Sequence, residues 1–505
     1  MIGKFFVIIL LLVGMRSSLS AKPVLTLDEF FNATSFSFVK LSPNDGQSIL
    51  IQTKHRIWDR NVSEEHLHFQ KISSKDRTLI TTQASSYSPL WKGDFLALIL
   101  ANSLSDQTQY IHLYSISTGQ MSALPVGKET IHAYAWSTTS MSIYFATRTP
   151  WTDAEQEAYE KEWRDVIEYR EQYRGDSIYR ADIENMTLTR IEFLTNISLR
   201  VVELVCSPNG KQLVFSTQPP SLIMEQMTDY ELYSLDLTHK APIIPFRLTN
   251  NLAIEANLKW SMGESLFFTV IHSGSMQGEY EDSQGRLYDL DMSTRRIQRW
   301  ANQFNGQVNE YGLLEDGRGG VVILGQLSTE VQVYTQASAT ADLIKRDGWN
   351  GSYQNIATAS LGSSTTIAFV HSSYEKAQEV YFAENINQLN TAQVITNENQ
   401  LFSKRSLPEG KTYRWINEDD QTAIEGILLY PPGKFEQKNL PLFVLIHGGP
   451  YNGDLNIFLA NWYKCGGMMA TEGWLVLQPN YRGSVGVYDL LQQYLDSVLF
   501  FLKIL

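Results

Sequence analysis

Two short segments near the end of the 505-residue sequence carry residue types suited to chemistry at an acyl group. One is the segment 446–450, Ile-His-Gly-Gly-Pro, and the other is the segment 479–486, Pro-Asn-Tyr-Arg-Gly-Ser-Val-Gly. A glycine pair lets backbone N–H groups approach an oxygen that becomes negative during acyl transfer. Gly448 and Gly449 are therefore candidate oxyanion-hole residues, although a His-Gly-Gly triplet by itself also fits an ordinary turn.

The nucleophile that acyl transfer requires is not evident in the sequence. No Gly-x-Ser-x-Gly segment follows residue 486, and no acid or base is assigned there, so we expect the Ser-Asp-His triad to be missing. Ser484 lacks the strand-elbow pattern of an activated serine and an assigned base, and we do not expect it to react. The stretch 487–505 reads as the ending of a shortened isoform, a frameshift or an incomplete gene model.

Both glycine-containing segments follow strands of a predicted α/β sheet. From about residue 413, the pattern predicts a strand at 424–430, fully buried strands at 442–446 and 474–477, and a helix at 455–471. Alternating buried strands and helices favour a parallel sheet. Such sheets bind ligands beyond the carboxyl ends of their strands, which is where both segments fall.

A repeated unit of about fifty residues occupies residues 40–400. Each unit has a turn with Ser-Pro or Asp-Gly, a hydrophobic strand, a polar gap and a strand with an aromatic-Ser/Asp-Leu pattern. Seven turns serve as anchors, at Ser42, Ser88, Ser137, Ser207, Ser261, Glu315 and Gly362. This period indicates a β-propeller, because four-stranded units bury their faces against neighbours around a ring. The prediction is seven blades, with a β-sandwich or a string of small β-domains as the alternative.

One step of the repeat is longer because residues 151–175 read as an inserted helix. Thr152 and Glu155 form a capping box, and Gly175 stands where a left-handed C-cap is expected. The helix is rich in glutamate, including Glu168 and Glu171. These side chains either form a solvated face or project one or two carboxylates into a cavity that holds a positively charged ligand terminus.

Residues 1–20 read as a secretory signal peptide, with Lys4 before the apolar run 5–13 and small residues at the cleavage site. A signal anchor is the alternative, but the run is shorter than the roughly 20 residues of a membrane span. We expect a protein secreted or held in the lumen of the secretory or lysosomal pathway, without a stable membrane span after cleavage. Five sequons are glycosylation candidates on this route, at Asn32, Asn61, Asn185, Asn196 and Asn350.

Composition argues against several kinds of partner. The net charge is −13 and no basic stripe is visible, so we expect no binding to nucleic acid. Cys206 and Cys465 lie far apart in the sequence and are expected as two buried free thiols. No spacing resembles a zinc or haem ligand set, so no metal and no cofactor is expected.

On these motifs the chain resembles the prolyl oligopeptidase family of serine peptidases, in its acylaminoacyl-peptidase and dipeptidyl-peptidase branch. Its most specific segments are 425–432, Glu-Gly-Ile-Leu-Leu-Tyr-Pro-Pro, and the two glycine-containing segments. The resemblance implies a mainly β seven-bladed propeller at 21–410, carrying the helical insertion. An α/β-hydrolase domain would follow at 411–505, truncated before the catalytic serine.

The resemblance also implies a function. It predicts a secreted serine-type peptidase that releases short N-terminal units from peptides through an acyl-enzyme, with Gly448 and Gly449 in the oxyanion turn. Glu168 or Glu171 would bind the free amine of the substrate. Without a triad, the chain is expected to be inactive by itself. The alternative is a non-catalytic propeller protein that binds peptides or a protein partner.

Overall fold

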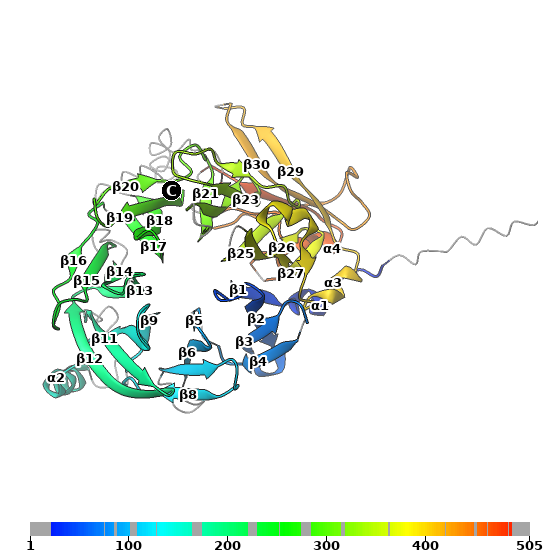
Figure 1. The fold of residues 1–505 in the computed structure, drawn as a ribbon. Helices are drawn as coiled ribbons and strands as arrows, with labels where there is room; N and C mark the ends of the chain where they lie inside the picture. The colour runs from blue at the N-terminus through cyan, green and yellow to red at the C-terminus, as the bar shows by residue number, and fades with distance from the viewer. Residues whose placement is uncertain are drawn as a thin grey trace, which may run out of the picture.

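The computed structural model describes residues 22–74, 76–84, 88–101, 109–127, 129–163, 174–220, 230–251, 253–273, 284–314, 319–361, 364–419, 421–448, 452–461, 463–482 and 484–486. The strands of these residues form eight four-stranded sheets. In the first seven sheets, strands that are consecutive in the chain pair as antiparallel neighbours. Figure 1 shows these seven sheets around a central opening, with the eighth sheet to one side.

The first four sheets contain, in chain order, β1 (Ser35–Leu41), β2 (Ser48–Ile57), β3 (Val62–Lys71), β4 (Arg77–Thr81), β5 (Leu90–Lys92), β6 (Phe95–Ala101), β7 (Gln109–Ser115), β8 (Met121–Leu124), β9 (Ile131–Trp136), β10 (Ser142–Arg148), β11 (Asp176–Glu184), β12 (Thr187–Ile197), β13 (Arg200–Cys206), β14 (Gln212–Gln218), β15 (Leu232–Asp236) and β16 (Phe246–Arg247). The next three sheets contain β17 (Ala253–Trp260), β18 (Ser265–Ser273), β19 (Arg286–Asp291), β20 (Ile297–Arg299), β21 (Gln307–Leu313), β22 (Val321–Leu327), β23 (Glu330–Gln336), β24 (Ile344–Lys345), β25 (Ser352–Leu361), β26 (Ser364–Ser373), β27 (Lys376–Ala383) and β28 (Gln393–Val394). The helical segments are α1 (Leu27–Phe31), η1 (Trp58–Arg60), α2 (Asp153–Trp163), η3 (Ile386–Thr391), α3 (Gln400–Ser403) and α4 (Gly466–Thr471).

The predicted repeat corresponds to these sheets, with one error of register. The aromatic-Ser/Asp-Leu pattern falls on the third strand of a sheet in β7, β11, β15 and β19. The anchor at Ser88 is wrong because this residue precedes β5, and the corresponding turn is formed by Gly93, whose φ of +57° suits a tight turn. The anchors at Glu315 and Gly362 lie outside the described residues.

Burial on both faces explains why each sheet needs its neighbours. Both β9 and β10 are buried along their whole lengths. Their apolar side chains contribute to two clusters, one shared with the second sheet and one shared with the fourth. A sheet that is apolar on both faces is stable only between two others, so each unit depends on the next one along the chain.

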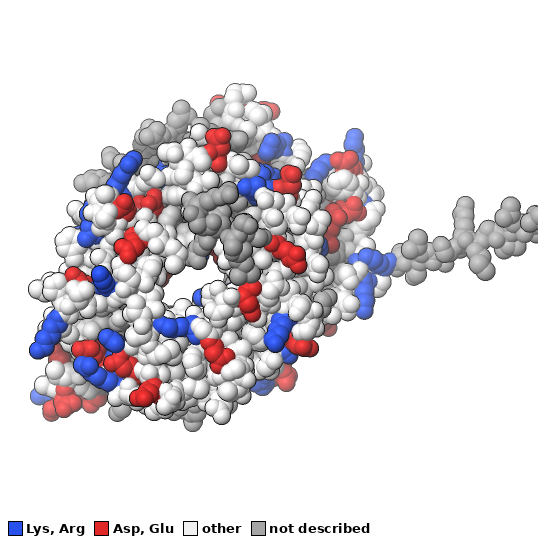
Figure 2. Space-filling view, in the orientation of Figure 1, with Lys and Arg blue, Asp and Glu red and all other residues white. Residues whose placement is uncertain are grey.

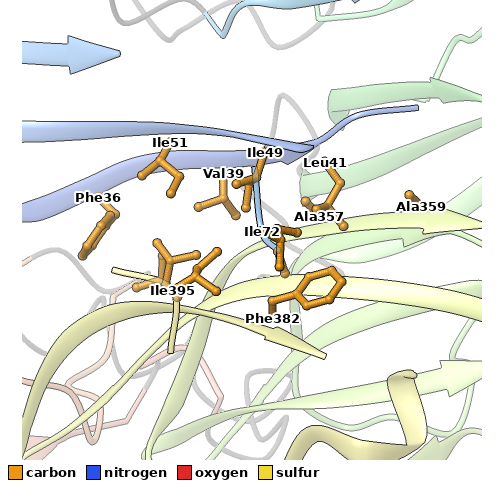
Figure 3. Packing of buried hydrophobic residues seen from close by; sticks show 13 residues of the cluster. Phe36, Val39, Leu41, Ile49, Ile51, Ile72, Ala357, Ala359, Phe382 and Ile395 are labelled. Carbon is orange, nitrogen blue, oxygen red and sulfur yellow. The ribbon is translucent and has the colours of Figure 1, made fainter. Parts of the chain in front are cut away.

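The first and seventh sheets pack directly against each other, which joins the two ends of the series (Figure 3). Side chains of β1 and β2, including Val39 and Ile51, lie in one apolar cluster with Phe382 of β27 and with Ile395. No strand pair among the described residues connects these two sheets. Polar contacts support the packing, since Gln70 Nε2 donates to the carbonyl oxygen of Ile395 at 2.9 Å.

Acidic and basic side chains are interspersed on the face that Figure 2 shows. No basic stripe crosses that face, although basic side chains lie at the rim of the central opening. Among the described helices, none is long and apolar enough to cross a membrane.

The eighth sheet contains β29 (Glu409–Ile416), β30 (Ala423–Tyr430), β32 (Leu475–Asn480) and β31 (Leu442–Val444), in that spatial order. Only β31 and β32 are parallel, so the expected parallel sheet is a mixed one. The predicted strand at 424–430 is confirmed as β30. The expectation of a fully buried strand at 442–446 is wrong, because β31 is an edge strand and Leu442, Val444 and Ile446 are exposed.

The helix predicted at 455–471 is also wrong for most of its length, since α4 contains only its last turns. The residues before α4 instead form hydrogen bonds with the seven-sheet ring. Asn456 Nδ2 donates to Glu330 Oε1 at 2.9 Å, and the backbone N–H of Phe458 donates to Ser372 Oγ at 3.3 Å. These contacts with the ring hold the backbone out of a helical path.

The inserted helix is confirmed at its start, and the structure describes it as α2 as far as Trp163. Glu155 N donates to Thr152 Oγ1 at 3.3 Å and Thr152 N donates to Glu155 Oε2 at 2.7 Å, which is the predicted capping box. The left-handed cap at Gly175 is wrong, because its φ is not positive. Glycine is needed there for space, since a Cβ atom would lie 1.8 Å from the carbonyl oxygen of Ile197.

Candidate functional site

The two glycine-containing segments meet at the carboxyl ends of β31 and β32. These strands are parallel neighbours, so the residues that follow them leave the sheet at the same edge. The rings of His447 and Tyr481 stack with centroids 4.5 Å apart and planes inclined by 21°. Tyr481 Oη donates to the carbonyl oxygen of His447 at 3.0 Å. The stack and this hydrogen bond fix one segment against the other.

A buried hydrogen bond joins His447 to Ser484. The two side chains are 3.0 Å apart, between His447 Nε2 and Ser484 Oγ. Ser484 is 1% exposed and lies in a turn in which its backbone N–H donates to the carbonyl oxygen of Tyr481. The sequence alone does not indicate a base for Ser484. One feature of the sequence could have suggested this contact. Both segments follow predicted neighbouring strands, and parallel strands bring together the residues that follow their carboxyl ends.

The protonation of His447 follows from its surroundings. Burial is the main cause that lowers its pKa, whereas the Asp454 carboxylate acts in the opposite direction. The ring is therefore neutral at neutral pH. Nδ1 faces the carbonyl oxygen of Gly448 at 3.4 Å, and a carbonyl can only accept, so we place the proton on Nδ1. Nε2 then accepts from the Ser484 hydroxyl.

An ion pair with Lys464 and the side-chain amide of Asn480 hold Asp454 near His447. Lys464 Nζ donates to Asp454 Oδ1 at 2.7 Å, and Asn480, the last residue of β32, exchanges two hydrogen bonds with the backbone of Asp454. The Asp454 side chain is 3% exposed. The ion pair and the amide hold Asp454 against the end of β32.

Gly448, the first of the two predicted oxyanion residues, is exposed. A Cβ atom built on it would meet no atom within 4 Å, so nothing in the described part of the chain fills the space beside it. The space can admit a ligand oxygen, which is what an oxyanion turn requires. Gly449 lies outside the described residues.

The segment 484–486 is attached to the ring as well as to the sheet. Gly486 N donates to Gln284 Oε1 at 2.9 Å, and Ser328 N donates to the carbonyl oxygen of Gly486 at 2.8 Å. Gln326 Nε2 donates to the carbonyl oxygen of Val485 at 3.1 Å. The ring therefore helps to position the loop that contains Ser484, which sequence reasoning did not anticipate.

The other predicted site residues lie away from this loop pair or outside the described residues. Glu168 and Glu171 are in the latter group. The start of α2 borders an open pocket of about 720 Å³ lined by Trp151, Glu155 and Arg174. Arg174 lies over the Trp151 ring at 4.4 Å. The five sequon asparagines, Asn32, Asn61, Asn185, Asn196 and Asn350, are all exposed.

Comparison with known proteins assigns the fold. The solved acylaminoacyl peptidase of Pyrococcus horikoshii matches with a TM-score of 0.67 and 14% sequence identity, covering 92% of this chain and 68% of that one. A scan against models of protein families gives no match. A probable dipeptidyl-peptidase 5 of Aspergillus niger is 22% identical over 292 residues, which are 55% of this chain and 38% of that relative. The acylamino-acid-releasing enzyme of Sus scrofa is 39% identical over 63 residues, 12% of this chain and 8% of that relative.

The fold is thus that of peptidases in which a β-propeller accompanies a hydrolase domain. The sequence alignments span well under half of each curated relative. Taken with the motifs, the sequence relatives and the structural neighbours support the resemblance to the prolyl oligopeptidase family.

Proposed function

We propose that the chain forms the propeller and the first part of the hydrolase domain of a serine-type peptidase that releases short N-terminal units from peptides. The observation that carries the proposal is the meeting of segments 446–450 and 479–486 beyond β31 and β32, with open space beside Gly448. Backbone donors of that turn would hold the substrate oxygen. The names of the relatives, a dipeptidyl-peptidase and an acylamino-acid-releasing enzyme, support this substrate class.

In this proposal the seven consecutive sheets are the seven blades of a propeller within residues 21–410, and residues 411–505 begin the hydrolase domain. The ring would limit access to short peptides. Glu168 or Glu171, which follow α2 in the sequence, would bind a substrate amine. The pocket beside α2, with Trp151 and Glu155 in its lining, supports a peptide-binding role for this region.

The proposal includes passage through the secretory pathway, with residues 1–20 removed as a signal peptide. A folded protein accommodates an N-linked oligosaccharide only at its surface, and all five sequon asparagines are exposed. Expression in a glycosylating host, followed by glycosidase treatment, should shift the mass of the protein. An unchanged mass would exclude this part of the proposal.

We further infer that residues 1–505 do not hydrolyse peptides by themselves. The Ser484–His447 pair has the contact of a nucleophile and its base, but a hydroxyl that is 1% exposed offers no approach to a substrate carbonyl. Treatment of the purified chain with a fluorophosphonate probe, which labels activated serines, should give no adduct. An adduct on Ser484 that disappears in Ser484→Ala would show that the pair is an active nucleophile and would overturn the inference.

A further inference from the structure

The ring has a second pocket, on the face away from the eighth sheet. Each of the first seven sheets is an antiparallel meander. The chain therefore turns on one face of the ring between the first and second strands of a sheet, and on the opposite face between the second and third strands. Contacts with the C-terminal segments come from the end of a second strand, at Arg56 of β2, and from second-to-third-strand connections, at Ser328 and Tyr374. The second pocket is bordered by first-to-second-strand turns, including Pro208 and Met262, and is therefore on the other face.

This pocket is lined mainly by the inner strands of five successive sheets, β1, β5, β9, β13 and β17, which Figure 1 shows around the central opening. Its volume is about 490 Å³, within the range of pockets that hold small ligands. The lining includes three tryptophans from three different sheets, Trp91, Trp136 and Trp260. No residue of the proposed peptide-cleaving site contributes to it.

Hydrogen bonds fix the orientation of the three indole rings. Trp136 Nε1 donates to the carbonyl oxygen of Leu90 at 3.1 Å, and Trp260 Nε1 donates to that of Val205 at 3.3 Å. Trp91 Nε1 donates to the carbonyl oxygen of Gly93 at 2.9 Å. Because each indole N–H already has a backbone partner, the rings offer the pocket apolar surface, which suits an aromatic or aliphatic side chain.

Lys40 supplies a cation at the same pocket. Its Nζ donates to the carbonyl oxygen of Pro89 at 3.3 Å, and no ion pair within the described residues involves it. Lys92, in contrast, donates to the carbonyl oxygens of Ser137 and Ser140. An ammonium group has three donors, so Lys40 retains the capacity to bind an anion. Burial lowers the pKa of Lys40 to about 8, which leaves it mostly protonated at neutral pH.

The geometry points to a second binding site, in which the three indoles hold the apolar side chain of a peptide's C-terminal residue and Lys40 binds its carboxylate. Lys40 is the one lysine in the lining of this pocket, which matches a ligand with one negative charge. A polyanion does not fit, because the chain has a net charge of −13 and the pocket offers a single lysine in its lining. This site is independent of whether the chain cleaves peptides.

Fluorine NMR with the full 505-residue chain tests the proposal. The probe is acetyl-Ala-Ala-(4-fluorophenylalanine), compared as the free acid and as the C-terminal amide. We expect the acid to bind about tenfold more tightly than the amide, because the amide lacks the charge that pairs with Lys40. Equal affinities for the acid and the amide, or no binding of the acid at millimolar concentration, would overturn the proposal.

Variants locate the binding. Lys40→Met should remove the preference for the acid, Lys40→Arg should retain it, and Lys240→Met, which removes an exposed lysine elsewhere, should leave it unchanged. At the rim, Met262 is 72% exposed, so Met262→Glu should fold normally and weaken binding of the acid. Ile244→Glu is the matched control at an 89% exposed residue outside the pocket.

If the acid still binds better than the amide in Lys40→Met and Met262→Glu, the carboxylate is held elsewhere and the assignment is wrong. None of these positions lies in the segments 446–450 and 479–486. If the acid does not bind as expected, the proposed peptidase function is therefore unaffected. If the peptidase function is disproved, the binding measurements still test this site by themselves.

Discussion

At the scale of single residues, the hydrogen bond between His447 and Ser484 is the feature that the sequence did not reveal. Both residues were visible as members of motifs, but 36 residues separate them and no spacing rule connects them. Their contact depends on the parallel pairing of β31 with β32, which is a property of the sheet. The apolar run and the glycine pair are local signals that suggest Gly448 as an oxyanion candidate, and that role stays a prediction.

Replacing Ser484 by alanine tests whether this bond is structural. The change leaves the buried Nε2 of His447 without its hydroxyl partner, and we expect a loss of about 1–3 kcal/mol in the free energy of unfolding. Urea denaturation measures this loss. Ser198→Ala, at an exposed serine, is the control and should change the free energy by less than about 0.5 kcal/mol. Equal effects of both variants would contradict a structural role for Ser484.

A second residue-scale prediction concerns Glu255, which is buried and accepts from Thr249 Oγ1 and Asn251 Nδ2. Burial is the main cause that raises its pKa from 4.5 to about 8. The protonated carboxyl therefore contributes stability that is fully present below the unfolded pKa and is lost as the pH rises through the folded pKa. The free energy of unfolding should fall between about pH 4.5 and about pH 8, and Glu255→Gln should flatten this dependence. Glu184→Gln, at an exposed carboxyl, should not.

At the scale of elements, a local signal predicted the structure where the interacting residues are close in sequence, and it failed where a distant partner decides the structure. The capping box of α2 was predictable because its two residues are three positions apart and act on each other. The helix at 455–471 failed because Asn456 and Phe458 bond to the ring, a partner that a local pattern cannot include. Exposure of β31 depends in the same way on its place at the edge of the sheet.

The N-cap of α2 allows a prediction about the stability of a single element. Thr152→Ala removes the oxygen that accepts from Glu155 N, and an N-cap replacement of this kind costs about 1 kcal/mol. The cost should remain local, so amide hydrogen exchange in α2 should quicken while the melting temperature of the whole protein stays unchanged. A lower melting temperature would instead mean that α2 is coupled to the folding of the ring.

At the scale of the whole molecule, the sequence repeat predicted the succession of sheets along the chain. The contacts between the ring and the eighth sheet could not be predicted from it. The joint between them includes Gly486, which has a φ of +79° and would place a Cβ atom 2.8 Å from Gln326 Cγ. Gly486→Ala should therefore destabilise the protein by about 1–3 kcal/mol and loosen the joint to limited proteolysis. Gly433→Ala is the control, because its φ is +70° but its Cβ would meet no atom within 4 Å. Equal effects would show that the contact with Gln326 does not matter.

We propose that residues 1–505 provide the oxygen-binding side of a peptidase site and do not hydrolyse peptides by themselves. The most direct test is peptide turnover by the purified chain, assayed with chromogenic amides of a free dipeptide and of an acetylated amino acid. We expect no release of the chromophore above the rate in buffer. Release that co-purifies with the chain and is abolished by Ser484→Ala would contradict it.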